Sequence, residues 1–185
     1  MPKFRGFIAI DIDPFPKLIE IEREIKNSGA NVKCVEPENI HLTIKFLGDT
    51  DDSLIDRIKD IMNDSVENIE PFEIQLKGAG VFPNERYIKV IWIGIKNGES
   101  IGKIASKIDE KLSNLGFQKE KRKFSPHLTI ARVKNVKNKD NLVQIIEKYR
   151  QVEFVNMKVN SIKLKKSDLT PKGPIYTTLK EINFK

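Results

Sequence analysis

The 185-residue sequence has one cysteine, two histidines and no long apolar run. A lone Cys34 excludes an intramolecular disulfide and a cysteine-based metal cluster, and nothing around it indicates an activated nucleophile. The longest apolar run, Val90 to Ile95, spans six residues, whereas a transmembrane helix needs about 20. Residues 1–6 lack the apolar core and cleavage site of a signal peptide. We therefore expect a cytoplasmic protein that does not bind membranes.

Motifs for metal, nucleotide and redox chemistry are also missing. The sequence contains no His-Glu-x-x-His, and two histidines without an obvious third ligand make a weak zinc site. It has no phosphate-binding Gly-x-x-x-x-Gly-Lys-Ser/Thr loop and no dinucleotide fingerprint. We expect no metal and no cofactor.

The composition describes a globular protein with an excess of positive charge. Hydrophobic residues make up 39% and charged residues 32% of the chain, enough apolar side chains for one domain with a single core. The net charge of +7 favours an anionic partner, of which nucleic acid is the commonest, although a Lys/Glu surface of thermostable type gives a similar value. One local cluster is more informative and consists of Lys119, Lys121, Arg122 and Lys123, with Arg132 and Lys134 farther along.

The main feature is a repeated tetrapeptide that contains both histidines. His41 to Ile44 and His127 to Ile130 have the same sequence, His-Leu-Thr-Ile. After a given histidine, this match has a chance of roughly one in two thousand at ordinary residue usage. Both copies lie in β-branched, apolar segments, and a strand sends alternate side chains to opposite faces. Each copy then presents one imidazole and one hydroxyl on one face and buries Leu and Ile behind them.

The order of segments predicts an α+β fold with an internal repeat. Helix, motif strand, helix and hairpin follow one another twice, with the two motifs 86 residues apart. The predicted helices cover about 14–28, 51–62, 99–115 and 139–149, and the predicted hairpins pair 72–82 with 86–95 and 154–164 with 175–184. We expect a single bilobal unit over 1–185, with lobes near the sequence halves 1–97 and 98–185. Each lobe would hold an antiparallel β-sheet with outer helices, and pseudo-twofold symmetry would place the motifs across a central cleft.

Two histidines in one cleft are suited to cleaving a phosphodiester. A neutral imidazole accepts a proton from the attacking group, and an imidazolium donates one to the leaving oxygen. Thr43 and Thr129 would provide hydroxyl donors to the phosphate. Arg132 could add a charge-assisted contact, but strand alternation alone places it opposite His127 and Thr129, so a bulge would be required. A single histidine or threonine on a strand is usually structural, and only the repetition favours function.

Two aromatic residues have both a structural and a functional interpretation. Phe46 is expected in the core or, alternatively, as a platform for a base. Tyr176 is by default a hairpin residue that could approach the cleft. The sequence does not decide between these alternatives.

The motifs resemble those of the two-histidine phosphoesterases, and more closely those of RNA 2′,3′-cyclic phosphodiesterases, also called 2′-5′ RNA ligases. The similarity extends over nearly the whole chain and includes 5–10, 39–48, 78–83, 92–94 and 126–132, then Ser167, Leu169, Gly173, Pro174 and Tyr176. Membership implies metal-free hydrolysis of RNA 2′,3′-cyclic phosphate ends to 2′-phosphates, and reversible ATP-independent 2′-5′ ligation. The RNA could be a transfer RNA fragment or another processed end, and we expect a monomer.

The resemblance also implies a role for each site residue. His41 would be the proton donor and His127 the proton acceptor, while Thr43, Thr129 and Arg132 would hold the phosphate. Phe46 would touch the terminal base or ribose. Two other functions remain open: a non-catalytic module that binds RNA ends, and a phosphodiesterase for a small cyclic or 2′-5′-linked nucleotide.

Overall fold

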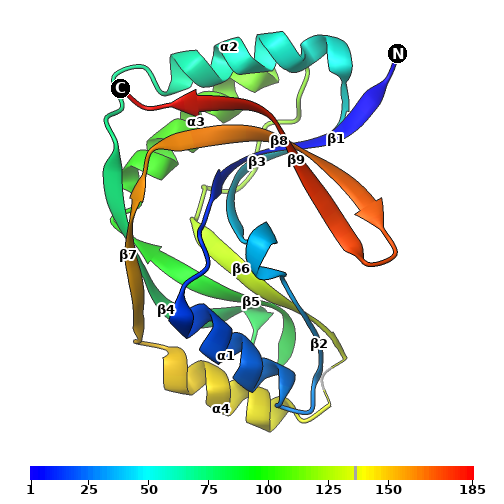
Figure 1. Cartoon of the computed structure of the whole chain (residues 1–185), viewed down its shortest axis with the longest axis vertical. Coiled ribbons are helices and arrows are strands. Elements are labelled where there is room, and N and C mark those ends of the chain that lie inside the picture. Colours follow the sequence, from blue (N-terminus) through cyan, green and yellow to red (C-terminus); the bar gives the residue numbers. More distant parts are fainter. Residues whose placement is uncertain (136) are drawn as a thin grey trace.

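The computed structural model describes residues 1–135 and 137–185, which form two lobes, each a sheet with a pair of helices on its outer side (Figure 1). The first half of the chain contributes β1 (Lys3–Asp11), α1 (Pro16–Lys26), β2 (Asn31–Cys34), β3 (His41–Asp51), α2 (Ile55–Ser65), β4 (Phe72–Asn84) and β5 (Tyr87–Lys96). The second half contributes α3 (Glu99–Ser113), β6 (His127–Asn135), α4 (Lys139–Tyr149), β7 (Glu153–Val159), β8 (Ser161–Thr170) and β9 (Gly173–Asn183). Short 3-10 turns at Pro37–Asn39 and Asp52–Leu54 flank β3.

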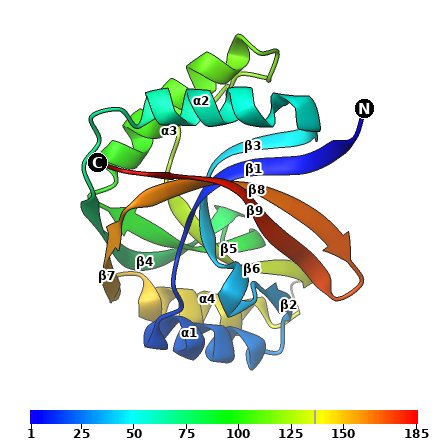
Figure 2. The ribbon, with the colours of Figure 1, turned by 45° about the horizontal axis from the view of Figure 1, so that its top comes forward.

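Both sheets are antiparallel throughout. The four-stranded sheet has the order β3-β1-β8-β9, and the five-stranded sheet has the order β2-β6-β5-β4-β7. Helices α2 and α3 contact each other on the outer side of the first sheet, and α1 and α4 contact each other on the outer side of the second (Figures 1 and 2). The two sheets therefore turn their helix-free faces toward the middle of the molecule.

The helices form because each carries an apolar stripe that packs on a sheet. In α1 the buried Leu18, Ile21 and Ile25 recur at helical spacing, and in α3 the same pattern includes Ile101, Ile104, Ile108 and Leu112. These stripes and the inward Leu and Ile residues of the strands belong to one continuous core. The expected α+β fold with two lobes is confirmed.

The lobes do not follow the sequence halves 1–97 and 98–185. The chain passes between the sheets at β1 to β2, at β2 to β3, after α2 and between β7 and β8, so each sheet contains strands from both halves. For the same reason the predicted hairpin of 154–164 with 175–184 is wrong in its first arm: residues 153–159 belong to the five-stranded sheet, and β9 pairs with β8. The short strand β2 was not predicted.

The topology nevertheless contains a repeat around the two motif strands. The order β3-β1-β8 in one sheet matches β6-β5-β4 in the other. In each repeat the motif strand pairs with the strand before the helix, β3 with β1 and β6 with β5. The helices match too, because α1 and α3 each leave the sheet of the preceding strand and pack in the opposite lobe. The repeat boundary therefore falls inside the β4–β5 hairpin.

One core residue has an unusual environment. Glu22, on α1, is 2% exposed, and its Oε1 has no hydrogen-bond partner within the described structure. Burial raises the pKa of this carboxyl to about 7, with Lys26 opposing the shift and Glu36 adding to it. In the unfolded chain the carboxyl has its ordinary pKa of 4.5. Folding is therefore opposed by Glu22 once the pH rises above 4.5, and most strongly above 7.

Replacing Glu22 by Gln is expected to stabilise the protein at high pH. At pH 8 the gain in unfolding free energy should approach about 3 kcal/mol, and it should vanish near pH 4, where both states are protonated. Urea unfolding at the two pH values measures the gain. The exposed Glu67→Gln serves as control, and an equal effect of both substitutions would refute the burial argument.

No helix of the described residues is long and apolar enough to cross a bilayer.

Candidate active site

Both motifs begin a strand, and their polar side chains share the helix-free faces of the two sheets. His41 and Thr43 on β3 are half-buried, as are His127 and Thr129 on β6, while the intervening leucines and isoleucines are buried. Strands β3 and β6 contact each other although they belong to different sheets. The sequence prediction of one imidazole and one hydroxyl on a common face is therefore confirmed for each strand.

Each motif strand contains a bulge at the same place. In β3, Thr43 pairs with Ala9 and Lys45 with Ile8, which leaves Ile44 without a partner on β1. The bulge shifts the later residues by one step, so Lys45 is buried and Phe46 is exposed.

The bulge in β6 supplies the bend that Arg132 requires. Thr129 pairs with Trp92 and Ala131 with Ile91, so Ile130 has no partner on β5. Ile130 and Ala131 are both buried, and Arg132 is exposed on the face of the motif. Phe46 and Arg132, each five residues after a motif histidine, thus occupy equivalent positions.

The two imidazoles are oriented by the same backbone contact. His41 Nδ1 lies 2.7 Å from the carbonyl oxygen of Asn39, and His127 Nδ1 lies 2.9 Å from that of Ser125. A carbonyl oxygen only accepts, so Nδ1 carries the hydrogen in both rings. Each Nε2 is therefore free to accept a proton, or to donate one when the ring is charged.

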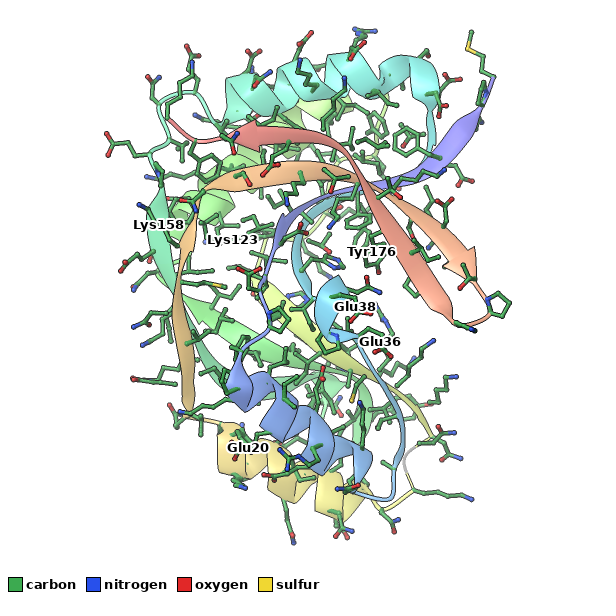
Figure 3. All side chains as sticks on the ribbon, in the orientation of Figure 1. Glu20, Glu36, Glu38, Lys123, Lys158 and Tyr176 are labelled. Atoms are coloured by element: carbon green, nitrogen blue, oxygen red, sulfur yellow. The ribbon has the colours of Figure 1, made fainter. Side chains whose placement is uncertain are left out.

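Aromatic rings hold His41 in place. The His41 ring lies 5.0 Å from that of Phe7 and 5.2 Å from that of Tyr176, and the latter pair is edge to face. Tyr176 lies on β9 close to the start of β3 (Figure 3). This places the tyrosine, which the sequence left undecided, in contact with the first motif.

His127 has one aromatic neighbour of the same kind. The rings of Phe82 and His127 are 5.0 Å apart and edge to face, and Phe82 in turn lies 5.3 Å from Trp92. Sequence reasoning missed both Phe7 and Phe82. Phe82 belongs to β4, two strands away from β6, and only the strand order brings it to the motif.

Several charges act on His41. Its pKa is lowered, mainly by burial, while the Asn39 carbonyl raises it. Lys165 lowers it further, Asp11 opposes this, and Arg132 adds a smaller lowering effect. Free of ligand, His41 therefore favours the neutral form.

Asp11 limits the effect of Lys165 on the pKa of His41. Lys165 Nζ lies 2.6 Å from one carboxylate oxygen of Asp11, and Lys163 Nζ lies 2.8 Å from the other. Burial raises the pKa of this carboxyl, but the hydrogen bonds and charges of the two lysines outweigh burial and lower it. Asp11 also faces His41 in the β1–β3 register, so the ion pairs lie directly beside the first motif.

Arg132 connects the two lobes electrostatically. Its charge lowers the pKa of His41, and it opposes the rise that burial causes in the pKa of Tyr176. Both partners belong to the four-stranded sheet, whereas Arg132 belongs to the five-stranded sheet. Together with the contact between β3 and β6, this indicates that the two motifs line one candidate site. Its chemical groups are two oriented imidazoles, two hydroxyls and one guanidinium.

Phe46 is 66% exposed, with its ring 6.5 Å from that of Phe7. A large apolar side chain left in solvent at the edge of such a site is available to a ligand. The expectation of a core position for Phe46 is wrong.

Comparison with known proteins identifies the family. Residues 15–184 match the family of the AKAP7 2'5' RNA ligase-like domain. The chain belongs to the two-histidine phosphoesterase family. The RNA 2',3'-cyclic phosphodiesterase of Methanocaldococcus jannaschii is 48% identical over 179 residues, covering 96% of this chain and 99% of the relative. That of Methanothermobacter thermautotrophicus is 42% identical over 179 residues, covering 96% and 97%.

Solved structures have the same fold as this chain. TT0787 of Thermus thermophilus superposes with a TM-score of 0.80 at 24% identity, covering 97% of each chain. Escherichia coli LigT complexed with 3'-AMP superposes with a TM-score of 0.72 at 20% identity, covering 99% of each chain. The two solved structures thus share the bilobal fold of this chain.

Proposed function

We propose that this protein hydrolyses the terminal 2′,3′-cyclic phosphate of RNA to a 2′-phosphate by acid-base catalysis with its two histidines. The observation that carries the proposal is the matched orientation of the imidazoles, each with Nδ1–H donated to a backbone carbonyl and Nε2 left for the substrate. The naming of relatives as RNA 2',3'-cyclic phosphodiesterases, at 35 to 48% identity, supports the same substrate.

The reaction needs one proton acceptor and one proton donor. His127 Nε2 accepts a proton from water as the water oxygen bonds to phosphorus. The bond from phosphorus to the 3′ oxygen breaks, and His41 Nε2 donates a proton to that oxygen. The products are a 3′-hydroxyl and a 2′-phosphate, and the two histidines return to their starting states when solvent resets their protons.

The phosphoryl oxygens need hydrogen-bond donors while the fifth bond to phosphorus forms. The hydroxyls of Thr43 and Thr129 can each donate one hydrogen bond, and Arg132 can donate two in parallel. These donors are fixed by the strands and the bulges before substrate binds, which avoids reorganisation during the reaction.

The lowered pKa of His41 is compatible with a role as acid. A phosphodiester anion beside Nε2 favours the imidazolium and so raises the pKa when substrate binds. Burial and the charges of Lys165 and Arg132 then make the bound imidazolium a stronger acid toward the leaving oxygen. The Asn39 carbonyl keeps the ring aligned in both charge states.

The same site can also bind the terminal nucleotide through Phe46 and carry out ligation. The exposed Phe46 ring offers an apolar surface to the terminal ribose or base. An RNA 5′-hydroxyl in place of water would give a 2′-5′ linkage, and the strained cyclic phosphate supplies the driving force without ATP.

The test is incubation with a short RNA that ends in a 2′,3′-cyclic phosphate, with chelator present and ATP absent. We expect a 2′-phosphate product, identified by chromatography against 2′- and 3′-phosphate standards. A 3′-phosphate product would contradict the assigned leaving group. Binding without turnover by folded protein would favour the non-catalytic module, and turnover restricted to free nucleotides would favour the small-nucleotide phosphodiesterase.

A further inference from the structure

A groove of about 470 Å³ adjoins the proposed active site at Phe46. One wall is the second half of β3, from Lys45 to Gly48, and the other is the segment Phe117–Arg122 between α3 and β6. Its volume falls in the range of sites that hold small ligands, roughly 300–1,000 Å³. The groove contains most of the basic cluster that the sequence showed and that the proposed chemistry does not use.

The basic wall is fixed to β3 by a buried lysine. Lys45 Nζ donates to Asp109 on α3 at 2.6 Å, to the carbonyl oxygen of Gln118 at 2.7 Å and to Glu120 at 3.2 Å. The backbone N–H of Glu120 donates to both oxygens of Asp109, at 3.1 and 3.2 Å. These contacts hold the segment against the strand.

The same contacts bind the negative charge of the segment Phe117–Arg122 to Lys45 and leave its positive charges in solvent. Glu120 is its one acidic residue, and Lys45 binds that carboxylate. Lys119, Lys121 and Arg122 are exposed, and none of them forms an ion pair within the described structure. The groove therefore presents uncompensated positive charge to solvent. Lys123, the next residue, lies on the opposite side of β1 and β3 from Tyr176 in the view of Figure 3.

Aromatic and glycine residues complete the groove. Phe46 forms its end nearest the site and has the exposed ring on which a base can stack. Gly48 has a φ of 68°, a conformation that favours glycine. Because glycine has no side chain, the β3 wall of the groove is not built up at this position. An exposed aromatic beside a basic track is the arrangement by which proteins bind single-stranded nucleic acid.

We propose that this groove binds the RNA strand on the 5′ side of the cyclic phosphate, with backbone phosphates against Lys121 and Arg122. The inference rests on the proposed function, which places the terminal nucleotide at the two histidines. In this arrangement a mononucleoside 2′,3′-cyclic phosphate would end at Phe46 and would not reach these cations. The groove then selects RNA ends over free cyclic nucleotides.

The test compares two double variants on two substrates. In one variant Lys121→Gln and Arg122→Gln remove groove charges. In the other, Arg23→Gln and Lys26→Gln remove one arginine and one lysine from exposed positions of α1 in the opposite lobe. The substrates are a hexanucleotide with a 2′,3′-cyclic phosphate end and a mononucleoside 2′,3′-cyclic phosphate. Affinity for the hexanucleotide is measured in parallel by fluorescence anisotropy at several salt concentrations.

The groove variant should raise KM and Kd for the hexanucleotide on the order of tenfold and reduce the salt slope by about 1.4, since each single-strand phosphate contact contributes about 0.7. Its kcat, and its KM for the mononucleoside, should stay at wild-type values. Equal affinity of the two variants for the hexanucleotide would overturn the proposal that the groove binds RNA. Wild-type binding of the hexanucleotide without turnover would instead overturn the proposed function and leave the groove supported by the affinity difference.

Discussion

Replacing either motif histidine by alanine is expected to lower kcat/KM for a cyclic-phosphate RNA by about a thousandfold, since general acid or base catalysis typically contributes about 10² to 10⁴. In His127→Ala no group accepts the proton of water, and in His41→Ala none donates to the 3′ oxygen. The doubly substituted protein should lose much less than the product of the two factors, because both proton transfers serve the same displacement at phosphorus. Initial rates with a fluorescent RNA measure the effect.

The control for these variants is Asn135→Ala, at the exposed end of the same strand as His127. It should leave the rate unchanged. Thermal unfolding of all variants establishes that the fold survives, which matters most for His41 because it packs against Phe7 and Tyr176. More than about a tenth of wild-type activity in either folded histidine variant would contradict the acid-base assignment.

The second large effect concerns stability. Lys45→Met is expected to lower the unfolding free energy by about 3–5 kcal/mol, the usual cost of removing one partner from a buried ion pair. The Lys45 side chain is 3% exposed and that of Asp109 14%, so in the variant the Asp109 carboxylate loses its cation away from water and retains the backbone N–H of Glu120 as a donor. The double substitution Lys45→Met with Asp109→Leu should recover most of the loss, because no unpaired charge remains away from water; Glu120, the other carboxylate bound to Lys45, is 59% exposed.

Denaturant unfolding at neutral pH measures this loss. The stabilisation by the Lys45–Asp109 pair should also depend on pH. Burial raises the pKa of Asp109, but the hydrogen bond and charge of Lys45 outweigh burial and the pKa is lowered. The stabilisation is therefore present above the ordinary pKa of 3.8 and is lost as the pH falls below it. Lys77→Met removes an exposed ion pair with Glu153 and should cost less than about 1 kcal/mol. A similar small cost for Lys45→Met would refute its anchoring role.

Local patterns were sufficient to predict the motif strands and the helices. Alternation in His-Leu-Thr-Ile placed the imidazole and the hydroxyl of each copy on one face, and the helical spacing of residues such as Leu18 and Ile21 marked the buried faces of the helices. The repeat also predicted two related lobes. Each of these inferences uses only neighbours in the sequence, whose geometry is fixed by the periods of strand and helix.

Features that depend on distant segments could not be read from the sequence. The bulges at Ile44 and Ile130 arise from pairing with β1 and β5, and they turn Phe46 and Arg132 to the face of the motif. Strand crossing between the lobes made the expected sequence halves incorrect. Lys45, an ordinary charged residue in the sequence, is buried because Asp109 and the basic segment surround it.

The central claim is the assignment of His41 as acid and His127 as base, and a change of leaving atom tests it most directly. In a cyclic substrate with sulfur in place of the 3′ oxygen, the leaving thiolate needs no proton. The account predicts that the rate deficit of His41→Ala shrinks to within about tenfold of wild type on this substrate, while that of His127→Ala persists. Equal deficits of the two variants on both substrates, or rescue of His127→Ala instead, would contradict the assigned roles.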